Sequence, residues 1–194
     1  HHTELDLSAT FSAMTGGNIY LKYENSQKTG SFKIRGASNK IAALVERGET
    51  GAVVASSAGN HAQGVAYAAH RFGIPATIVM PKTAPIAKAK ATEGYGATVV
   101  LAGDCYDDAY AKACEICEQE HATFLHPYND PEVIAGQGTL GLEILGDLPT
   151  ADVVIVPAGG GGLLAGVAAC IKQINPRVQV IGVQAEGADA IAQS

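Results

Sequence analysis

Hydrophobic residues along this chain follow two alternating spacings. Alternating or continuous apolar runs predict strands near residues 19–24, 52–56, 76–80, 97–101, 123–126, 153–156 and 178–183. Apolar residues at helical spacing predict a helix from about residue 31 to the residue before Gly48, and further helices near 61–72, 84–94, 105–120, 131–145, 163–174 and 187–194. No helix is expected ahead of residue 19. The regular alternation from residue 52 onward favours parallel sheets with helices on both faces.

Two of the predicted strand-to-helix connections carry the composition of an anion site. Residues 57–64 read Ser-Ala-Gly-Asn-His-Ala-Gln-Gly, and residues 159–162 are four consecutive glycines. Each connection places backbone N–H groups at the carboxyl end of a strand and the N-terminus of a helix, where an anion is favoured. Glycine also allows the main chain to approach a phosphate closely. Neither segment matches a Walker loop or a dinucleotide fingerprint, so a phosphate-bearing ligand of another kind is predicted.

Lys33 occupies an unusual place for a lysine. It lies in the first turn of the predicted helix, which Thr29 or Ser31 can cap, and the helix dipole disfavours a cation there. A positive neighbourhood lowers the pKa of a lysine and favours its neutral, nucleophilic form. The position therefore points to a Schiff-base lysine, with a solvated first-turn lysine as the alternative that this feature alone leaves open.

Composition narrows the class of protein. The chain has 194 residues and a net charge of −6, with no basic stripe of the kind that binds nucleic acid. The uncharged run 153–171 is long enough for a membrane span, but Pro157 and the glycines favour strand, loop and helix. The four cysteines lack the spacing of a disulfide framework, which favours a reduced, cytoplasmic protein. Cys114 and Cys117 fall on an apolar helix face without a second ligand pair, so no metal site is expected.

Four motifs together resemble one enzyme family. They are Lys-Thr-Gly-Ser-Phe-Lys-Ile-Arg-Gly-Ala at 28–37, Ser-Ala-Gly-Asn-His-Ala-Gln-Gly at 57–64, Val-Ile-Ala-Gly-Gln-Gly-Thr at 133–139 and Gly-Gly-Gly-Gly-Leu at 159–163. In this order they resemble the β-family (fold type II) of pyridoxal-phosphate enzymes, and most of all its threonine/serine ammonia-lyase branch. The resemblance implies a two-lobed α/β fold like that of the tryptophan synthase β-subunit, in a homo-oligomer. Residues 52–128 would form a small lobe, and residues 1–51 and 129–194 would form part of a larger one in what is expected to be a partial chain.

The same resemblance assigns roles to individual residues. Lys33 would bind pyridoxal 5′-phosphate covalently and act as the catalytic base, and Phe32 would pack against the cofactor ring. Asn60 would hydrogen-bond the 3′-oxygen of that ring. The phosphate would be held by Gly159, Gly160, Gly161, Gly162 and Leu163. The substrate carboxylate would be received by Ser57, Ala58, Gly59, Asn60 and His61, and for His61 a structural role at the start of the helix remains the alternative.

The implied reaction is β-elimination of a hydroxy amino acid, L-threonine and also L-serine, to a 2-oxo acid and ammonia. Serine racemases of this fold carry a serine as a second base where this chain has Ala58, so elimination is favoured over racemisation. Those racemases also bind a divalent cation through carboxylates whose positions are occupied here by Gln184 and Ala190. A racemase-like enzyme and a non-catalytic phosphate-ligand-binding module remain the alternatives.

Overall fold

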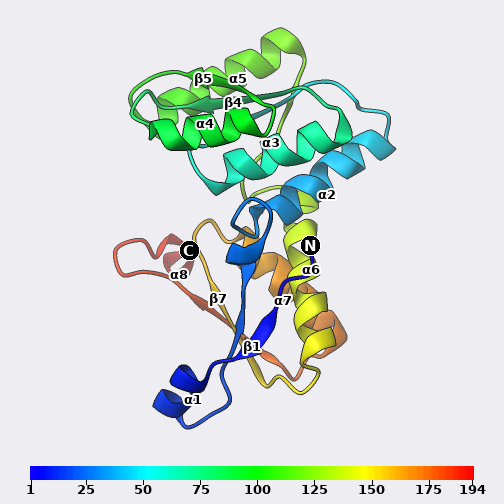
Figure 1. Ribbon diagram of the computed structural model, residues 1–194, viewed down its shortest axis with the longest axis vertical. Coiled ribbons are helices and arrows are strands. Elements are labelled where there is room, and N and C mark those ends of the chain that lie inside the picture. The colour runs from blue at the N-terminus through cyan, green and yellow to red at the C-terminus, as the bar shows by residue number, and fades with distance from the viewer.

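A four-stranded parallel sheet forms the upper part of the molecule (Figure 1). The computed structural model describes residues 1–194. The strands are β3 (Val53–Ser56), β4 (Ala76–Met80), β5 (Thr98–Leu101) and β6 (Thr123–Phe124), in the spatial order β5-β4-β3-β6. Every neighbouring pair is parallel. The four strands predicted between residues 52 and 128 are therefore present, and their carboxyl ends meet at one edge of the sheet.

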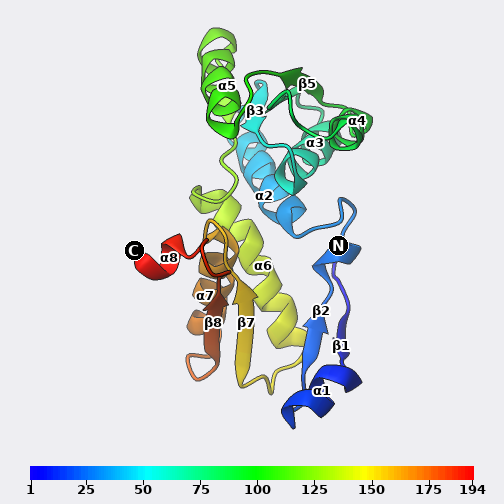
Figure 2. The same cartoon turned by 90° about the vertical axis from the view of Figure 1, so that its left-hand side faces the viewer.

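Helices cover both faces of this sheet (Figure 2). On one face, α3 (Asn60–Phe72) and α2 (Lys33–Glu46) contribute to a buried core with Val53 and Ala55, and α4 (Ile86–Gly94) packs beside α3. On the other face, α5 (Tyr106–Glu120) packs against Val54 and Val79. Because successive residues of a strand point to opposite faces, the continuous apolar run of β3 serves both cores.

A second, smaller sheet lies in the lower part of the molecule. It consists of β7 (Val153–Pro157) and β8 (Gln179–Val183), which pair in parallel. The helices α6 (Pro131–Asp147) and α7 (Gly162–Ile174) pack on one of its faces. Ile155 is 64% exposed and Val183 is 52% exposed, so the other face is open. The expectation of helices on both faces is wrong for this sheet as the chain stands. A final short helix, α8, spans Ala190–Gln193.

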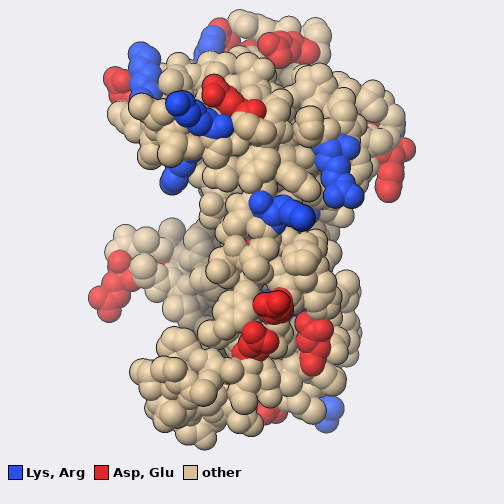
Figure 3. All heavy atoms as spheres, in the orientation of Figure 1, with Lys and Arg blue, Asp and Glu red and all other residues tan.

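The N-terminal segment forms an arm of which the sequence pattern predicts only the second strand. Its strands β1 (Leu5–Leu7) and β2 (Tyr20–Lys22) pair antiparallel, and α1 (Ala9–Thr15) lies between them. The expectation of no helix ahead of residue 19 is therefore wrong. This helix is capped by the Ser8 hydroxyl, which accepts the N–H of Phe11, but it buries no residue, so it has no apolar face to reveal it. On the face drawn in Figure 3, the region of α1 at the end of the arm shows no Lys, Arg, Asp or Glu.

The helix α2 joins the upper and lower parts of the molecule. Its later residues Ala37, Ile41 and Leu44 lie in the core of the four-stranded sheet, while its first turns cross α6. At that crossing a Cβ atom on Gly136 would lie 2.6 Å from both the Arg35 carbonyl oxygen and the Gly36 Cα. The division into lobes at residues 51/52 and 128/129 stays a prediction. The helix α2 contributes to the core of the four-stranded sheet, and Phe32, just ahead of it, packs against the core of the smaller sheet. None of the helices combines the length and apolarity needed to cross a bilayer.

Candidate active site

Lys33 opens into a pocket of about 440 Å³ at the carboxyl end of β3. It is the first residue of α2, as expected, but the predicted cap is wrong. Phe32 occupies the N-cap without a side-chain hydrogen bond. The Ser31 hydroxyl accepts only the N–H of Lys33, at 3.4 Å, and the Thr29 hydroxyl is buried without a partner. The first turn of α2 is therefore positioned by packing and by its crossing with α6.

The Lys33 amine is held close to the chain that links the two sheets. Its Nζ donates a hydrogen bond to the Pro127 carbonyl oxygen at 2.6 Å and lies 5.4 Å from the centre of the Phe32 ring. Burial lowers the pKa of Lys33 below its ordinary value, because the charged form loses solvation. A lysine in this environment has a larger neutral fraction, and only the neutral amine is a nucleophile.

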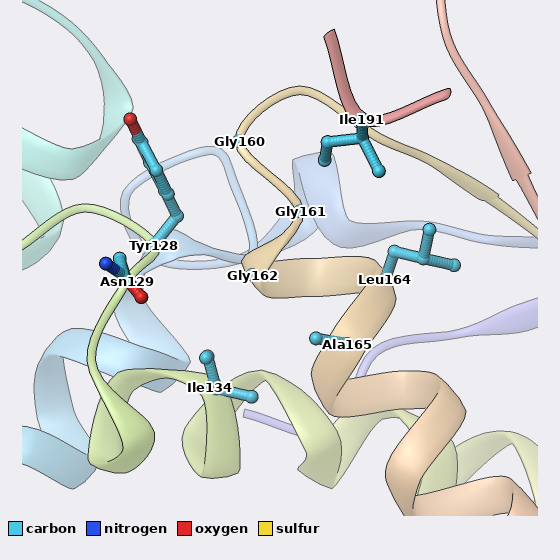
Figure 4. A pocket seen from close by; sticks show the side chains of 9 residues that line it. All are labelled: Tyr128, Asn129, Ile134, Gly160, Gly161, Gly162, Leu164, Ala165 and Ile191. Atoms are coloured by element: carbon cyan, nitrogen blue, oxygen red, sulfur yellow. The ribbon is translucent and has the colours of Figure 1, made fainter. Parts of the chain in front are cut away.

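The glycine loop lines a neighbouring pocket of about 370 Å³ (Figure 4). It runs from β7 into α7, which begins at Gly162, and no cationic residue lies between Asp152 and Lys172. The positive φ angle falls on Gly161, at 83°. A Cβ on Gly160 would lie 2.5 Å from the Tyr128 ring, whereas a Cβ on Gly159 would meet nothing within 4 Å. The loop therefore offers main-chain N–H groups and a helix N-terminus as its anion-binding groups.

The segment Ser57–His61 contributes to the wall of the pocket that Lys33 lines. Ser57, Asn60 and His61 line that pocket, and α3 begins at Asn60, so the first N–H groups of the helix have no intrahelical partner. The Ser57 hydroxyl accepts the N–H of Gly59 at 3.2 Å. The donors that this segment leaves free beside the pocket are therefore the N–H groups at the start of α3.

The His61 side chain has a defined tautomer. It is 3% exposed, and its Nε2 lies 2.9 Å from the Leu125 carbonyl oxygen. A carbonyl oxygen only accepts, so Nε2 carries the proton and Nδ1 is a bare acceptor, which is buried without a partner. Burial lowers the pKa of His61 to about 4, so the ring is neutral. The imidazole can therefore offer a carboxylate no proton from Nδ1, and of this residue only the backbone N–H is suited to that role.

The sequence motifs do not include the linker that connects β6 to α6. Pro127 and Tyr128 line the Lys33 pocket, and Tyr128 also lines the glycine-loop pocket, so one aromatic side chain borders both. Figure 4 shows the Tyr128 ring rising beside Gly160. Tyr106, at the start of α5, and Ser56 complete the wall of the first pocket. The sequence could have indicated these linker residues, because they follow the carboxyl end of a predicted strand. Parallel sheets bind their ligands at the carboxyl ends of their strands.

Comparison with known proteins explains this arrangement. The sequence profile of the family described as "Pyridoxal-phosphate dependent enzyme" matches residues 1–194. The chain belongs to this family. As a pyridoxal-phosphate dependent enzyme it has the mixed α/β fold that the sequence predicted, with a parallel sheet covered by helices.

Two curated relatives of this pyridoxal-phosphate enzyme match over all 194 residues of the chain. They are "L-threonine ammonia-lyase" of Thermotoga maritima, 59% identical, and "L-threonine dehydratase catabolic TdcB" of Escherichia coli, 54% identical. The chain covers 48% and 59% of these proteins, so it spans about half the length of the curated relatives it matches. Among solved structures, maize serine racemase (41% identical) and threonine deaminase isoform 2 from Solanum lycopersicum (44%) both match with a TM-score of 0.96, with 59% and 57% of their chains covered.

The residues of this family member fit pyridoxal phosphate. The cofactor requires an amine for its aldehyde and donors for its phosphate. Here the Lys33 amine and the glycine loop lie in adjacent pockets that share Tyr128. Side chains at Gly160, Gly161 and Gly162 would collide with neighbouring atoms, which explains why the loop is bare backbone. The structure contains no group of three or more His, Cys, Asp or Glu residues suited to a metal ion.

Proposed function

We propose that this chain forms the cofactor-binding portion of a threonine/serine ammonia-lyase, which eliminates water from a hydroxy amino acid and yields a 2-oxo acid and ammonia. One observation carries the proposal: the half-buried Lys33 amine opens into a pocket that adjoins a glycine loop at the start of a helix. The names of the relatives at 59% and 54% identity supply the substrate class, L-threonine.

Lys33 has two roles in this proposal. Its amine would hold the cofactor covalently, and as a free amine it would remove the α-proton of the substrate. When bound, pyridoxal phosphate supplies an electron sink for the charge left by that proton. The lowered pKa of Lys33 suits both roles, because each requires the neutral amine. Phe32, whose ring lies 5.4 Å from Nζ, is assigned to pack against the cofactor ring.

The remaining assignments follow from the two helix N-termini. Gly159 to Leu163, at the start of α7, are assigned to the phosphate, and the Asn60 side chain to the 3′-oxygen of the ring. In the segment Ser57–His61, the Ser57 hydroxyl and the backbone N–H groups of Ala58, Asn60 and His61 are assigned to the substrate carboxylate. The N–H of Ser57 donates to the Val79 carbonyl oxygen and that of Gly59 to the Ser57 hydroxyl. The neutral, internally bonded His61 ring supports the backbone rather than the imidazole as the carboxylate donor.

Racemisation is the second candidate reaction, because maize serine racemase superposes with a TM-score of 0.96. It requires a proton donor on the face of the substrate opposite Lys33. Ala58, in the Ser57–His61 segment, has no group that can exchange a proton. Its methyl group therefore favours elimination.

We also propose that the protein is cytoplasmic and forms a homo-oligomer. The four free cysteines support the cytoplasm as its compartment. The exposed apolar side chains of Phe11 and Met14 support association with a second copy.

Replacement of Lys33 tests the assignment. The full-length protein is incubated with pyridoxal phosphate, reduced with borohydride and mapped by peptide mass spectrometry. We expect a pyridoxyl group on Lys33 in the wild type and none in Lys33→Ala. The control is Lys28→Ala, because Lys28 is exposed on the turn before α2. We expect this variant to be labelled on Lys33 like the wild type. With L-threonine and L-serine, we expect 2-oxo acid to form faster than D-serine. A label on another lysine would overturn the role of Lys33, and faster racemisation would overturn the proposed reaction.

A further inference from the structure

The linker from Leu125 to Asp130 touches every part of the candidate site. The Pro127 carbonyl oxygen accepts the hydrogen bond from Lys33 Nζ at 2.6 Å. The Tyr128 ring lies so close to the glycine loop that a Cβ on Gly160 would be 2.5 Å from it, and a Cβ on Gly162 would be 2.8 Å from the Tyr128 carbonyl oxygen. The conformation of these few residues therefore sets where Lys33 and the glycine loop lie relative to each other.

One side chain holds this linker in its turn. His126 Nδ1 accepts the backbone N–H of Tyr128 at 3.3 Å and the N–H of Asn129 at 2.8 Å. The rings of His126 and Tyr128 also meet edge to face, with their centres 4.6 Å apart and their planes at 88°. Two N–H donors on Nδ1 mean that this atom carries no proton, so the neutral ring has its hydrogen on Nε2. Protonation of Nδ1 would remove the acceptor for both N–H groups.

We propose that His126 is a positioning residue for the cofactor site: its neutral imidazole holds the turn that places Tyr128 against the glycine loop and the Pro127 carbonyl group against Lys33. The proposal rests on the proposed function, since the affected property is binding of pyridoxal phosphate. It assigns a role to a histidine that lies outside the four sequence motifs. It also predicts that pyridoxal phosphate binds more weakly in acid, because protonation of His126 Nδ1 would release the turn.

The groups that face His126 favour its neutral form at neutral pH. Burial lowers its pKa, Asp130 on the same linker raises it, and the Lys33 ammonium group lowers it. His61, buried on α3, is electrostatically coupled to both His126 and Lys33 and is itself neutral. The phenol of Tyr128 lies beside the ring. The imidazole therefore gains its proton at a pH below the ordinary histidine range, and the turn is intact above that pH.

Two substitutions separate the acceptor from the ring. In His126→Asn, the side-chain oxygen can accept N–H groups two and three residues ahead, as in an Asx turn, and does not titrate. In His126→Leu, no acceptor remains. The measurement is the Kd of pyridoxal phosphate for the full-length protein, followed by fluorescence from about pH 8 to about pH 5. Lys33, His61 and the cofactor phosphate titrate in all three proteins, so a difference between their pH profiles isolates residue 126.

We expect His126→Leu to raise Kd by about tenfold at pH 8, consistent with two lost hydrogen bonds. We expect His126→Asn to keep the wild-type Kd at pH 8 and to lose the additional weakening that the wild type shows in acid. Without cofactor, nitrogen NMR of the wild type should show the proton on Nε2 of His126, and hydrogen exchange at Tyr128 and Asn129 should be faster in His126→Leu.

Two results would overturn the positioning role: a proton on Nδ1 of neutral His126, or the same Kd and pH profile in His126→Leu as in the wild type. Failure of the proposed function looks different. In that case the wild type would bind no pyridoxal phosphate at any pH, or would bind it and form D-serine faster than 2-oxo acid, while the NMR tautomer and the exchange pattern of the linker would still be as expected.

Discussion

The four glycines after β7 illustrate how differently neighbouring residues of one motif are constrained. Gly161 has a φ of 83°, which residues with a Cβ rarely adopt. Gly160 and Gly162 are limited by Tyr128, whose ring and carbonyl oxygen occupy the space of a side chain. Gly159 has no positive φ, and a Cβ added to it would meet no atom within 4 Å. As a result, the protein itself requires glycine at three of the four positions.

Gly160→Ala and Gly159→Ala form a matched pair that tests this interpretation. We expect Gly160→Ala to destabilise the protein by about 1–3 kcal/mol, because the new methyl group overlaps the Tyr128 ring and the linker must move. We expect Gly159→Ala to change the free energy of unfolding by less than about 0.5 kcal/mol. Chemical denaturation without cofactor measures both. Equal losses in the two variants would show that Tyr128 does not limit the loop.

At the scale of secondary-structure elements, a buried group of charges connects the N-terminal arm to the two helices that carry the site. Arg35 Nη2 on α2 lies 2.7 Å from Glu24 Oε1 and 2.9 Å from Glu143 Oε2 on α6. Lys22 Nζ on β2 lies 2.8 Å from the same Glu143 oxygen. The Arg35 side chain is 7% exposed and that of Glu143 is 14% exposed. Burial opposes ionisation of Glu143, but hydrogen bonds from Arg35 and Lys22 outweigh it and lower its pKa to about 2.

Glu143→Gln should therefore cost about 3–5 kcal/mol of unfolding free energy, since it leaves Arg35 and Lys22 without their shared carboxylate. Glu49→Gln is the control, because Glu49 forms an exposed pair with Arg47 and is worth at most about 1 kcal/mol. The pKa of Glu143 in the folded protein lies below its ordinary value of 4.5, so its contribution is complete above pH 4.5 and is lost as pH falls toward 2. Urea unfolding across this range should show a steeper acid loss in the wild type than in Glu143→Gln. Parallel acid profiles would contradict the assignment.

At the scale of the whole molecule, the two parts are joined through the crossing of α2 and α6. Gly36 and Gly136 meet there, and a Cβ on Gly136 would lie 2.6 Å from the Gly36 Cα. Close approach of two helix backbones is possible only where neither carries a side chain. Because α2 begins with Lys33 and α6 packs against α7, which follows the glycine loop, this crossing acts together with the Leu125–Asp130 linker in placing the lysine relative to the loop.

Gly136→Ala should push α2 away from α6 and destabilise the protein by about 1–3 kcal/mol. Gly146→Ala, in the same helix, is the control: its Cβ would meet nothing within 4 Å, so we expect no loss and a gain of up to about 1 kcal/mol from helix propensity. Thermal unfolding measures the difference between the two. If Gly136→Ala is as stable as Gly146→Ala, the close crossing is not required for the fold.

Local patterns were sufficient for most of the elements. Hydrophobic period and Gly/Pro positions predicted the strands and α-helices from residue 19 onward to within a few residues, because most of them pack an apolar face that leaves its period in the sequence. They failed for β1 and α1, whose residues are mostly exposed. The predicted N-cap of α2 was also wrong, since Thr29 and Ser31 are good cap residues that the packing of α2 directs elsewhere.

The proposed chemistry of the site comes from local motifs: a lysine at a helix start, a glycine loop after a strand, and the Ser57–His61 segment have residue types suited to it. The other groups that share the site became known only from the folded chain. Tyr128 borders both pockets, Pro127 meets Lys33, and His126 holds the turn between them. Lys33 and Pro127 are 94 positions apart in the sequence, and Tyr128 lies outside the glycine motif that it borders. No local period records such contacts, because they depend on how α2 crosses α6 and where β6 ends beside β3.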